Sequence, residues 1–360
     1  MSLKYRAVDW NRHKRYYDAA LFMLVLLPVL VYTLVTLWRS PEVTAETLMI
    51  RGCALSAILL LHITLCIGPL ARLSPLFSPL LYNRRHLGVT VFGLGLVHAG
   101  LAVFQFHALG NDNPLISTLT AYGRDYRLHG VGDISHFPFE IFGACALVIL
   151  FFMAATSHDF WLKNLGASIW KVLHLGVYAA YGLLIAHILL GAFQYERSAI
   201  YPTLLGAGFV VVAGLHLAAA QKESRFDRLG SRSGRIGMAE VCAASDVLEG
   251  RGKMVVVEGT RLALFRHQDR LFATSNVCRH QGGPIGEGRI VDGCITCPWH
   301  GWNYRPEDGC SPPPFHEVLP TFDVQVIEGR VWVRTTPNPM GVRSVGAIDQ
   351  RATTSGITPT

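Results

Sequence analysis

The run CRHQGGPIGEGRIVDGCITCPWHGWNYRPEDG, residues 278–309, contains two short groups of metal-binding side chains. Cys278 precedes His280 by two residues and Cys297 precedes His300 by three, so each group offers one thiolate and one imidazole. Thiolates suit iron–sulfur or zinc centres, and an imidazole in place of a thiolate raises the potential of an iron. The spacing therefore predicts a metal centre with these four ligands, and both metals are open at this point.

The surroundings of the two groups favour iron. Each group mixes Cys with His, whereas a zinc finger has two Cys followed by two His. Glycines follow both groups, at Gly282, Gly283 and Gly301, so the backbone can approach a buried cluster and donate N–H groups to its sulfurs. Around this run, residues 236–335 alternate between short strand patterns and turn signals, which predicts a compact all-β domain. Strands are expected at 254–257, 261–266, 271–275, 289–294, 322–327 and 331–333.

Over about 240–335 the chain resembles the Rieske [2Fe-2S] ferredoxin family. The resemblance implies that Cys278 and Cys297 hold one iron of a [2Fe-2S] cluster. It also implies that His280 and His300 hold the other iron, near the surface of the domain.

One difference within that family is informative. Rieske proteins of cytochrome bc complexes carry an extra Cys in each loop, and the two form a disulfide. Here those places hold Gln281-Gly282 and Trp299. The resemblance is therefore to the lower-potential ferredoxin branch, which suits a reducing cytoplasm.

The part of the chain before this domain has the composition of a membrane protein. Over all 360 residues, 51% are hydrophobic and only 16% are charged, which argues against a disordered chain or a purely cytosolic enzyme. A bilayer core of ~30 Å needs roughly 20 helical residues, and the shorter of the apolar spans must include flanking residues to reach that length. The spans lie at 21–38, 53–70, 87–109, 141–155, 172–193 and 200–220. They predict a membrane all-α six-helix bundle followed by the soluble all-β domain.

Positive charge gathers at alternate ends of these spans. The net charge of +7 therefore fits a membrane protein better than a nucleic-acid-binding one. The positive-inside rule places both termini and the Rieske-like domain in the cytoplasm, in a multi-pass protein of the bacterial inner (cell) membrane. The expected segments are a cytoplasmic N-terminal segment 1–20, the six-span domain 21–220, a linker 221–235, the β domain 236–335 and a flexible tail 336–360.

Several histidines lie within or at the edge of the spans, and ionisable groups there are functional hypotheses by default. A single intramembrane His often makes only an interhelical hydrogen bond, which is the reading we prefer for His62 and His216. His174 and His187 are thirteen residues apart on one helix, a rise of about 20 Å. His98 and His187 lie at matching depths, so a ring can be held between the third and fifth spans.

Residues 50–220 resemble the ferric reductase-like transmembrane domain, in the branch of haem-binding membrane subunits of bacterial methionine sulfoxide reductase systems. The resemblance is carried by RRHLG (84–88) leading to His98, and by WKVLHLGVY (170–178) leading to His187. It implies b-type haem with bis-His ligation by His98, His174 and His187. One haem is expected between His98 and His187. A second haem through His174 would need a fourth ligand, either His86 or His62.

Together these features predict a membrane electron-transfer protein with a [2Fe-2S] cluster and one or two haems b. A cytoplasmic donor, such as a flavoprotein reductase, would reduce the cluster, and electrons would pass through haem to ferric iron, a quinone, oxygen or a periplasmic protein. The reverse flow is open, as is the choice between an oxidoreductase and an electron-transfer subunit. The sequence indicates no catalytic residue and no nucleic-acid partner. The alternatives are a redox-sensing or metal-binding module without turnover, and the membrane arm of a complex with a separate flavoprotein.

Overall fold

The computed structural model describes residues 12–81, 84–108, 113–115, 117–118, 139–191, 199–228, 233–235, 237–280, 282–299 and 301–348. The chain divides into two compact units, residues 1–68 with 83–215 and residues 69–82 with 216–360. The first unit is helical, and the second contains helix ends together with the β-strands.

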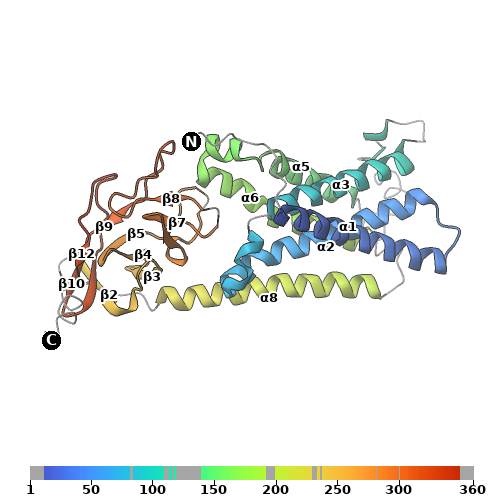
Figure 1. The fold of residues 1–360 in the computed structure, drawn as a ribbon. Coiled ribbons are helices and arrows are strands. Elements are labelled where there is room, and N and C mark those ends of the chain that lie inside the picture. The colour runs from blue at the N-terminus through green and yellow to red at the C-terminus, as the bar shows by residue number, and fades with distance from the viewer. Residues whose placement is uncertain are drawn as a thin grey trace, which may run out of the picture. The chain divides into compact units, whose positions relative to one another are not determined.

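Six α-helices form most of the described part of the membrane region (Figure 1). Five are long and apolar enough to cross a membrane, and the fourth is a shorter apolar helix of 16 residues that packs against the helices before and after it. Helices satisfy their own backbone N–H and C=O groups, which a bilayer core requires. The helices are α1 (Arg12–Arg39), α2 (Ala45–Leu73), α3 (Arg84–His107), α5 (Glu140–Ala155), α6 (Asp159–Leu190) and α8 (Ile200–Arg228). The predicted fold, six helices followed by a β domain, is confirmed.

Large apolar side chains cover the outside of these helices. Leu27, Phe104 and Val210 are 60%, 57% and 67% exposed. In water such a surface would be unstable, but in a bilayer the lipid tails are its solvent. The exposed apolar surface therefore supports a multi-pass membrane protein.

The segment 221–235, predicted as a linker, is partly regular structure. Helix α8 continues to Arg228, and the short strand β1 (Ser233–Arg235) pairs with β2 (Met238–Ala243). At the end of α8, Lys222 Nζ donates to the carbonyl oxygens of Arg72 at 2.9 Å and Leu73 at 3.1 Å, where α2 ends. A cation there satisfies carbonyls that have no intrahelical partner. This contact helps to explain why the helix extends beyond the apolar span.

A second set of contacts joins the end of α8 to the β domain within the same unit. The guanidinium of Arg261, on strand β4 (Thr260–His267), forms ion pairs with both Glu223 and Asp227. Its Nε and Nη2 lie 2.7 and 2.9 Å from the two carboxylate oxygens of Asp227, a bidentate arrangement. The acidic side chains of α8 are thus neutralised by the β domain.

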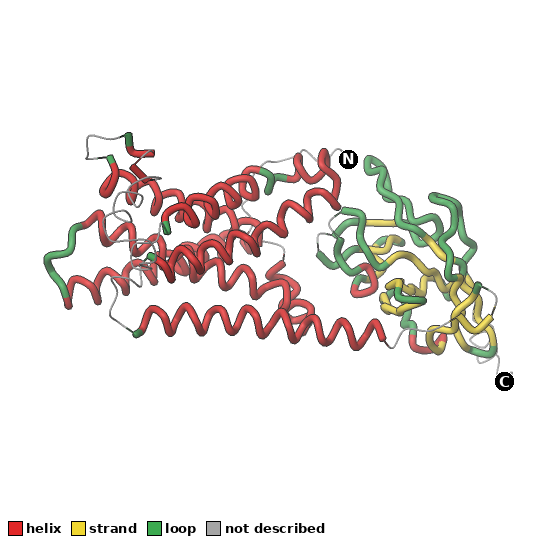
Figure 2. Tube along the Cα trace, turned by 180° about the vertical axis from the view of Figure 1, so that it is seen from behind, coloured by secondary structure: helices red, strands yellow, loops and turns green. Residues whose placement is uncertain are grey.

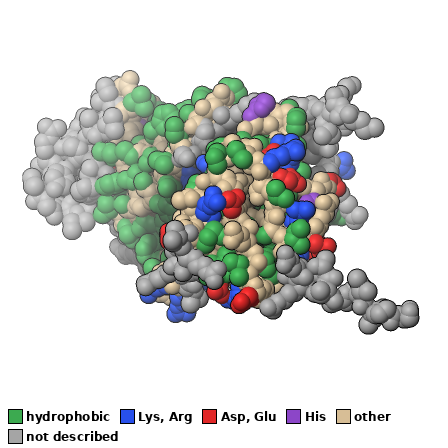
Figure 3. Space-filling view, turned by 90° about the vertical axis from the view of Figure 1, so that its left-hand side faces the viewer, with side chains coloured by type: hydrophobic (Ala, Val, Ile, Leu, Met, Phe, Trp, Pro, Cys, Tyr) green, Lys and Arg blue, Asp and Glu red, His purple; other side chains and the backbone are tan. Residues whose placement is uncertain are grey.

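The β domain contains three small antiparallel sheets (Figure 2). Their strand orders are β1-β2-β11-β10, then β12-β5-β4-β3 with β9 beside β5, and β6-β7-β8. In the space-filling view of Figure 3, charged side chains of both signs are interspersed on the face turned to the viewer. The remaining strands are β3 (Gly252–Val257), β5 (Arg270–Ser275), β6 (Arg289–Val291), β7 (Cys294–Thr296), β8 (Asn303–Tyr304), β9 (Thr321–Phe322), β10 (Val324–Ile327), β11 (Arg330–Arg334) and β12 (Ala347–Ile348).

Strand β4 separates two hydrophobic clusters because its side chains alternate between its two faces. Leu262 and Leu264 belong to a cluster formed by the larger sheets. Ala263 and Phe265 belong to the other cluster, which also contains buried cysteines of the metal-binding run. The two cysteine side chains of the predicted metal centre are therefore part of the hydrophobic core of the domain.

Several sequence predictions for this domain differ from the structure; for example, the strand predicted at 322–327 is divided between β9, which pairs with β5, and β10, which pairs with β11. Residues 289–294, predicted as one strand, form a β6–β7 hairpin, because Asp292 and Gly293 both have positive φ (50° and 75°) and make the tight turn. Part of the predicted flexible tail is ordered against the domain, since β12 pairs with β5 and Ser344 N donates to the Glu307 carbonyl at 2.7 Å. Residues 349–360 lie outside the described residues.

Candidate metal centre and membrane histidines

The two cysteine loops share one backbone hydrogen-bond pattern. Cys278 N donates to the carbonyl of Gly283 at 2.9 Å, and Cys278 O accepts from Gly282 N at 2.8 Å. In the second loop, Cys297 N donates to the carbonyl five residues on at 2.8 Å, and Cys297 O accepts from Gly301 N at 3.0 Å. Each loop therefore closes in the same way, with the cysteine at its start.

Glycine is required at the closing positions of these loops. Gly282 and Gly301 have φ of +74° and +69°, a left-handed conformation that other residues rarely adopt. A Cβ on Gly283 would lie 2.7 Å from the Sγ of Cys297. The first loop thus packs directly on the thiol of the second, and both Cys278 and Cys297 are only 2% exposed.

A tyrosine from the adjacent hairpin contacts the first cysteine. The hydroxyl oxygen of Tyr304 lies 3.3 Å from Cys278 Sγ and accepts from Arg279 N at 3.0 Å. Because it accepts that backbone N–H, its own proton is available for the sulfur. Burial, and then the neighbouring Cys278 thiol, raise the pKa of Tyr304 well above its ordinary value, so the hydroxyl keeps its proton at neutral pH. Sequence reasoning missed this residue.

The imidazole of His280 is held by aromatic stacking. Its ring lies nearly parallel to that of Trp302, with ring centres 4.3 Å apart and planes inclined by 6°. Trp302 is in turn fixed by a hydrogen bond from Nε1 to Ser311 Oγ (3.1 Å) and by contact with Phe315. The predicted ligand His300 lies outside the described residues.

These residues fit a [2Fe-2S] cluster with mixed ligation. The thiols of Cys278 and Cys297 are both buried, and the loop that follows the first packs on the Sγ of the second. An oriented imidazole, His280, follows the first of them by two residues. The described residues of this domain provide no α-helix of the kind a zinc finger uses.

In the membrane region the structure brings His98 of α3 and His187 of α6 together. Their ring centres are 6.3 Å apart and their planes are inclined by 81°. His98 Nδ1 lies 3.0 Å from the carbonyl oxygen of Ile50, and His187 Nδ1 lies 2.9 Å from that of Phe139. A carbonyl can only accept, so each Nδ1 carries the proton and each Nε2 presents a lone pair.

His98 and His187 would be able to hold one metal ion between them. An imidazole bound through nitrogen at about 2 Å has its ring centre about 3 Å from the ion, so two rings 6.3 Å apart are close enough to share one ion. The carbonyl partners fix the tautomer and ring orientation, as is usual for metal-bound histidines. Gly143 also permits the arrangement, because a Cβ there would lie 2.8 Å from His187 Nδ1.

His174 has a similar tautomer but a different environment. Its Nδ1 bonds to the Trp170 carbonyl at 3.0 Å, and its ring stacks on the indole at 3.8 Å. Its Nε2 is buried and has no hydrogen-bond partner among the described residues. His86, by contrast, is exposed, and its ring centre lies 6.3 Å from that of Tyr17 in an edge-on contact. The described contacts of His86 therefore do not include His174.

His62 makes the interhelical hydrogen bond that the sequence predicts. Its Nε2 lies 2.9 Å from the hydroxyl of Tyr181, and both side chains are buried. A Cβ on Gly208 would lie 2.7 Å from the same nitrogen, so α8 packs closely there. With this partner, His62 is satisfied without a metal.

Comparisons with known proteins found matches for both the membrane region and the β domain. Residues 237–323 match the family model of the Rieske [2Fe-2S] domain, and residues 52–185 match that of the ferric reductase like transmembrane component. The chain therefore contains a ferric reductase-like transmembrane domain followed by a Rieske [2Fe-2S] domain. Its Rieske domain is 31% identical to the ferredoxin component of the alkene monooxygenase system of Xanthobacter autotrophicus, over 29% of this chain and 86% of that protein.

The ferric reductase-like domain also has a relative. It is 34% identical to the protein-methionine-sulfoxide reductase heme-binding subunit MsrQ of Azospira oryzae, over 48% of this chain and 66% of that protein. Among solved structures, the complex of reduced oxygenase and oxidized ferredoxin in carbazole 1,9a-dioxygenase matches 29% of this chain and 99% of its own, with 31% identity and a TM-score of 0.27.

Proposed function

We propose that this chain is a membrane electron-transfer protein in which a cytoplasmic Rieske cluster exchanges electrons with intramembrane haem b. The family assignment supports an electron-transfer role. The observation that carries the haem part of the proposal is the His98–His187 pair, with ring centres 6.3 Å apart and both Nδ1 atoms bound to carbonyls. The name of the MsrQ relative, a heme-binding subunit, points the same way.

In this proposal the protein's own residues hold and tune the two groups. Cys278 and Cys297 would bind one iron, and His280 with His300 the other. Tyr304 would donate a hydrogen bond to Cys278 Sγ. When bound, the cluster and the haem each supply a one-electron centre.

In the membrane, His98 and His187 would ligate the first haem. The buried Nε2 of His174 makes it the candidate ligand of a second haem. Its partner would be His86, whose ring lies beside that of Tyr17, because His62 Nε2 already bonds to the Tyr181 hydroxyl.

The proposed orientation follows from charge. Basic residues gather on the side of the spans that carries both termini, so we place the Rieske domain in the cytoplasm of a bacterial cell. A cytoplasmic donor, such as a flavoprotein reductase, would then reduce the cluster. The acceptor across the membrane would be a metal ion, a quinone or a periplasmic protein.

Haem stoichiometry in single variants tests the proposal. The full chain is purified, and haem and iron are quantified for wild type, His98→Ala, His187→Ala and the matched control His62→Ala. We expect the first two variants to lose haem but keep cluster iron, and the control to keep both. Full haem in both His98→Ala and His187→Ala would contradict the proposed ligation.

A second role is supported by the MsrQ relative, whose name describes a subunit. In that role the chain is the membrane arm of a larger complex whose partner holds a flavin. Co-purification of a stoichiometric flavoprotein with the full chain would favour this role. If a free reductase reduced the cluster as fast as a co-purified flavoprotein does, the result would favour a self-sufficient protein.

A further inference from the structure

The end of helix α8 carries opposite charges on opposite faces. Glu223 and Asp227 are four residues apart and share one face, where both are bound by Arg261. Arg225 is two residues from each of them, which at about 100° per residue places it on the opposite side of the helix. Arg228, three residues further on, shares that second face. Among the described residues, Arg261 of the β domain thus neutralises the acidic face, and the residues that line the basic face all belong to α8.

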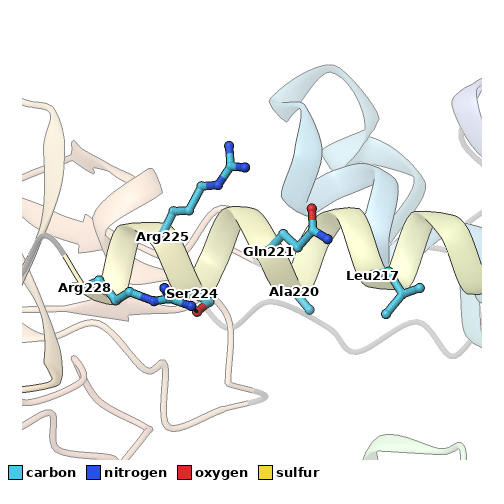
Figure 4. Close-up of a pocket in the computed structure, with 6 residues that line it drawn as sticks. All are labelled: Leu217, Ala220, Gln221, Ser224, Arg225 and Arg228. Atoms are coloured by element: carbon cyan, nitrogen blue, oxygen red, sulfur yellow. Dashed lines mark hydrogen bonds between the residues drawn. The ribbon is translucent and has the colours of Figure 1, made fainter.

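A hollow of about 450 Å³ lies along this basic face. Its lining changes along the helix from apolar to basic, and includes no acidic side chain. Leu217, at the apolar end, is 64% exposed. Figure 4 shows Arg225 extending away from the helix axis and Arg228 lying alongside Ser224, to whose Oγ its Nη2 donates at 3.2 Å. The lining residues are Leu217, Ala220, Gln221, Ser224, Arg225 and Arg228.

The length of this gradient matches a membrane boundary. From Leu217 to Arg225 the helix rises about 12 Å, at 1.5 Å per residue. The polar region on each side of a bilayer is about 5–8 Å thick. A lipid molecule beside α8 would therefore have its acyl chains at Leu217 and Ala220 and its phosphate at the level of the arginines.

We propose that this face binds the headgroup of an anionic phospholipid from the leaflet on the side of the Rieske domain. Arg225 and Arg228 would pair with the phosphate, and the polar side chains Gln221 and Ser224 would contact the headgroup. The apolar end of the hollow would contact the first part of the acyl chains. The lipid would pack on the helix face opposite the Arg261 ion pairs.

The test measures lipid binding and does not depend on haem or on electron transfer. Phosphatidylglycerol is titrated into the purified full chain in detergent, and bound lipid is counted by native mass spectrometry. The variant Arg225→Gln/Arg228→Gln is compared with Arg330→Gln/Arg334→Gln, which removes the same charge from strand β11. The paramagnetic resonance signal of the cluster verifies that the β domain of each variant is folded.

We expect the α8 variant to bind phosphatidylglycerol at least tenfold more weakly, since each basic residue near an anionic surface contributes about fivefold. The β11 control should bind as wild type does. Phosphatidylcholine should bind wild type more weakly than phosphatidylglycerol, and inorganic phosphate should not displace the lipid. Equal affinity in the α8 variant, equal binding of phosphatidylcholine, or displacement by phosphate alone would each overturn the proposal.

Discussion

The hydrogen bond from Tyr304 to Cys278 should raise the reduction potential of the cluster. Reduction adds negative charge to the iron–sulfur unit, and a hydroxyl that donates to Sγ stabilises that charge. Tyr304→Phe removes the hydroxyl but keeps the ring, which is fully buried in the core around the cysteines. The 3.3 Å contact is a modest hydrogen bond, so we assign it about 1 kcal/mol of preference for the reduced state. For a one-electron couple this corresponds to about 40 mV.

The potential is measured on the full chain by redox titration followed by paramagnetic resonance. Tyr304→Phe should lower it by about 40 mV without loss of iron. Thr296→Val is the matched control, because the acceptors of the Thr296 hydroxyl are Asn303 Oδ1 at 2.8 Å and the backbone carbonyl of Cys294 at 3.3 Å, and neither is a ligand sulfur. An unchanged or raised potential in Tyr304→Phe, or an equal fall in the control, would refute the reasoning.

Two further predictions concern glycines that adjoin the ligands. Gly283→Ala places a Cβ 2.7 Å from Cys297 Sγ, so the sulfur must move by about 0.7 Å to reach an ordinary contact of 3.4 Å. The iron content of the purified variant should therefore fall strongly. Full iron content would show that this loop is not part of the site. Gly143→Ala places a Cβ 2.8 Å from His187 Nδ1 and should reduce the amount of haem bound per chain. The control Gly95→Ala should keep its haem, because its Cβ would lie 3.5 Å from the nearest atom, in Leu147. Equal haem in the two variants would contradict the placement of His187.

The metal-binding run shows what spacing can predict. The pairing of one Cys with one His in each loop and the glycines that follow were sufficient to predict two similar loops. The role of Tyr304 was not predictable, because it depends on the register of β7 and β8, in which Ile295 pairs with Tyr304. A single tyrosine seven residues after Cys297 has no periodicity that would reveal this contact.

For the membrane histidines too, the sequence predicted which residues meet but not which groups bind them. Matching depth along two helices predicted that His98 and His187 would meet, and the structure brings them together. Their carbonyl partners come from Ile50 and Phe139, each 48 residues away in sequence, and depend on tertiary packing. The contact of His86 with Tyr17 likewise involves α1, which no pattern in the third span can indicate.

The ordered parts of the predicted linker and tail have a tertiary cause as well. Residues 221–228 have a charged, polar composition that is typical of a connecting segment. They remain helical with Lys222 bound to the end of α2 and Glu223 bound to Arg261. Composition alone does not reveal such partners.

The central claim is that a Rieske cluster and a haem b exchange electrons within one chain. The direct test is to add less than one reducing equivalent to the purified full chain and to record its visible and paramagnetic resonance spectra on the same sample. The account predicts b-haem bands together with a [2Fe-2S] signal, and a distribution of the electron between them that follows their measured potentials. A purified chain without b-haem bands, or a cluster that stays reduced beside a haem of higher potential, would contradict it.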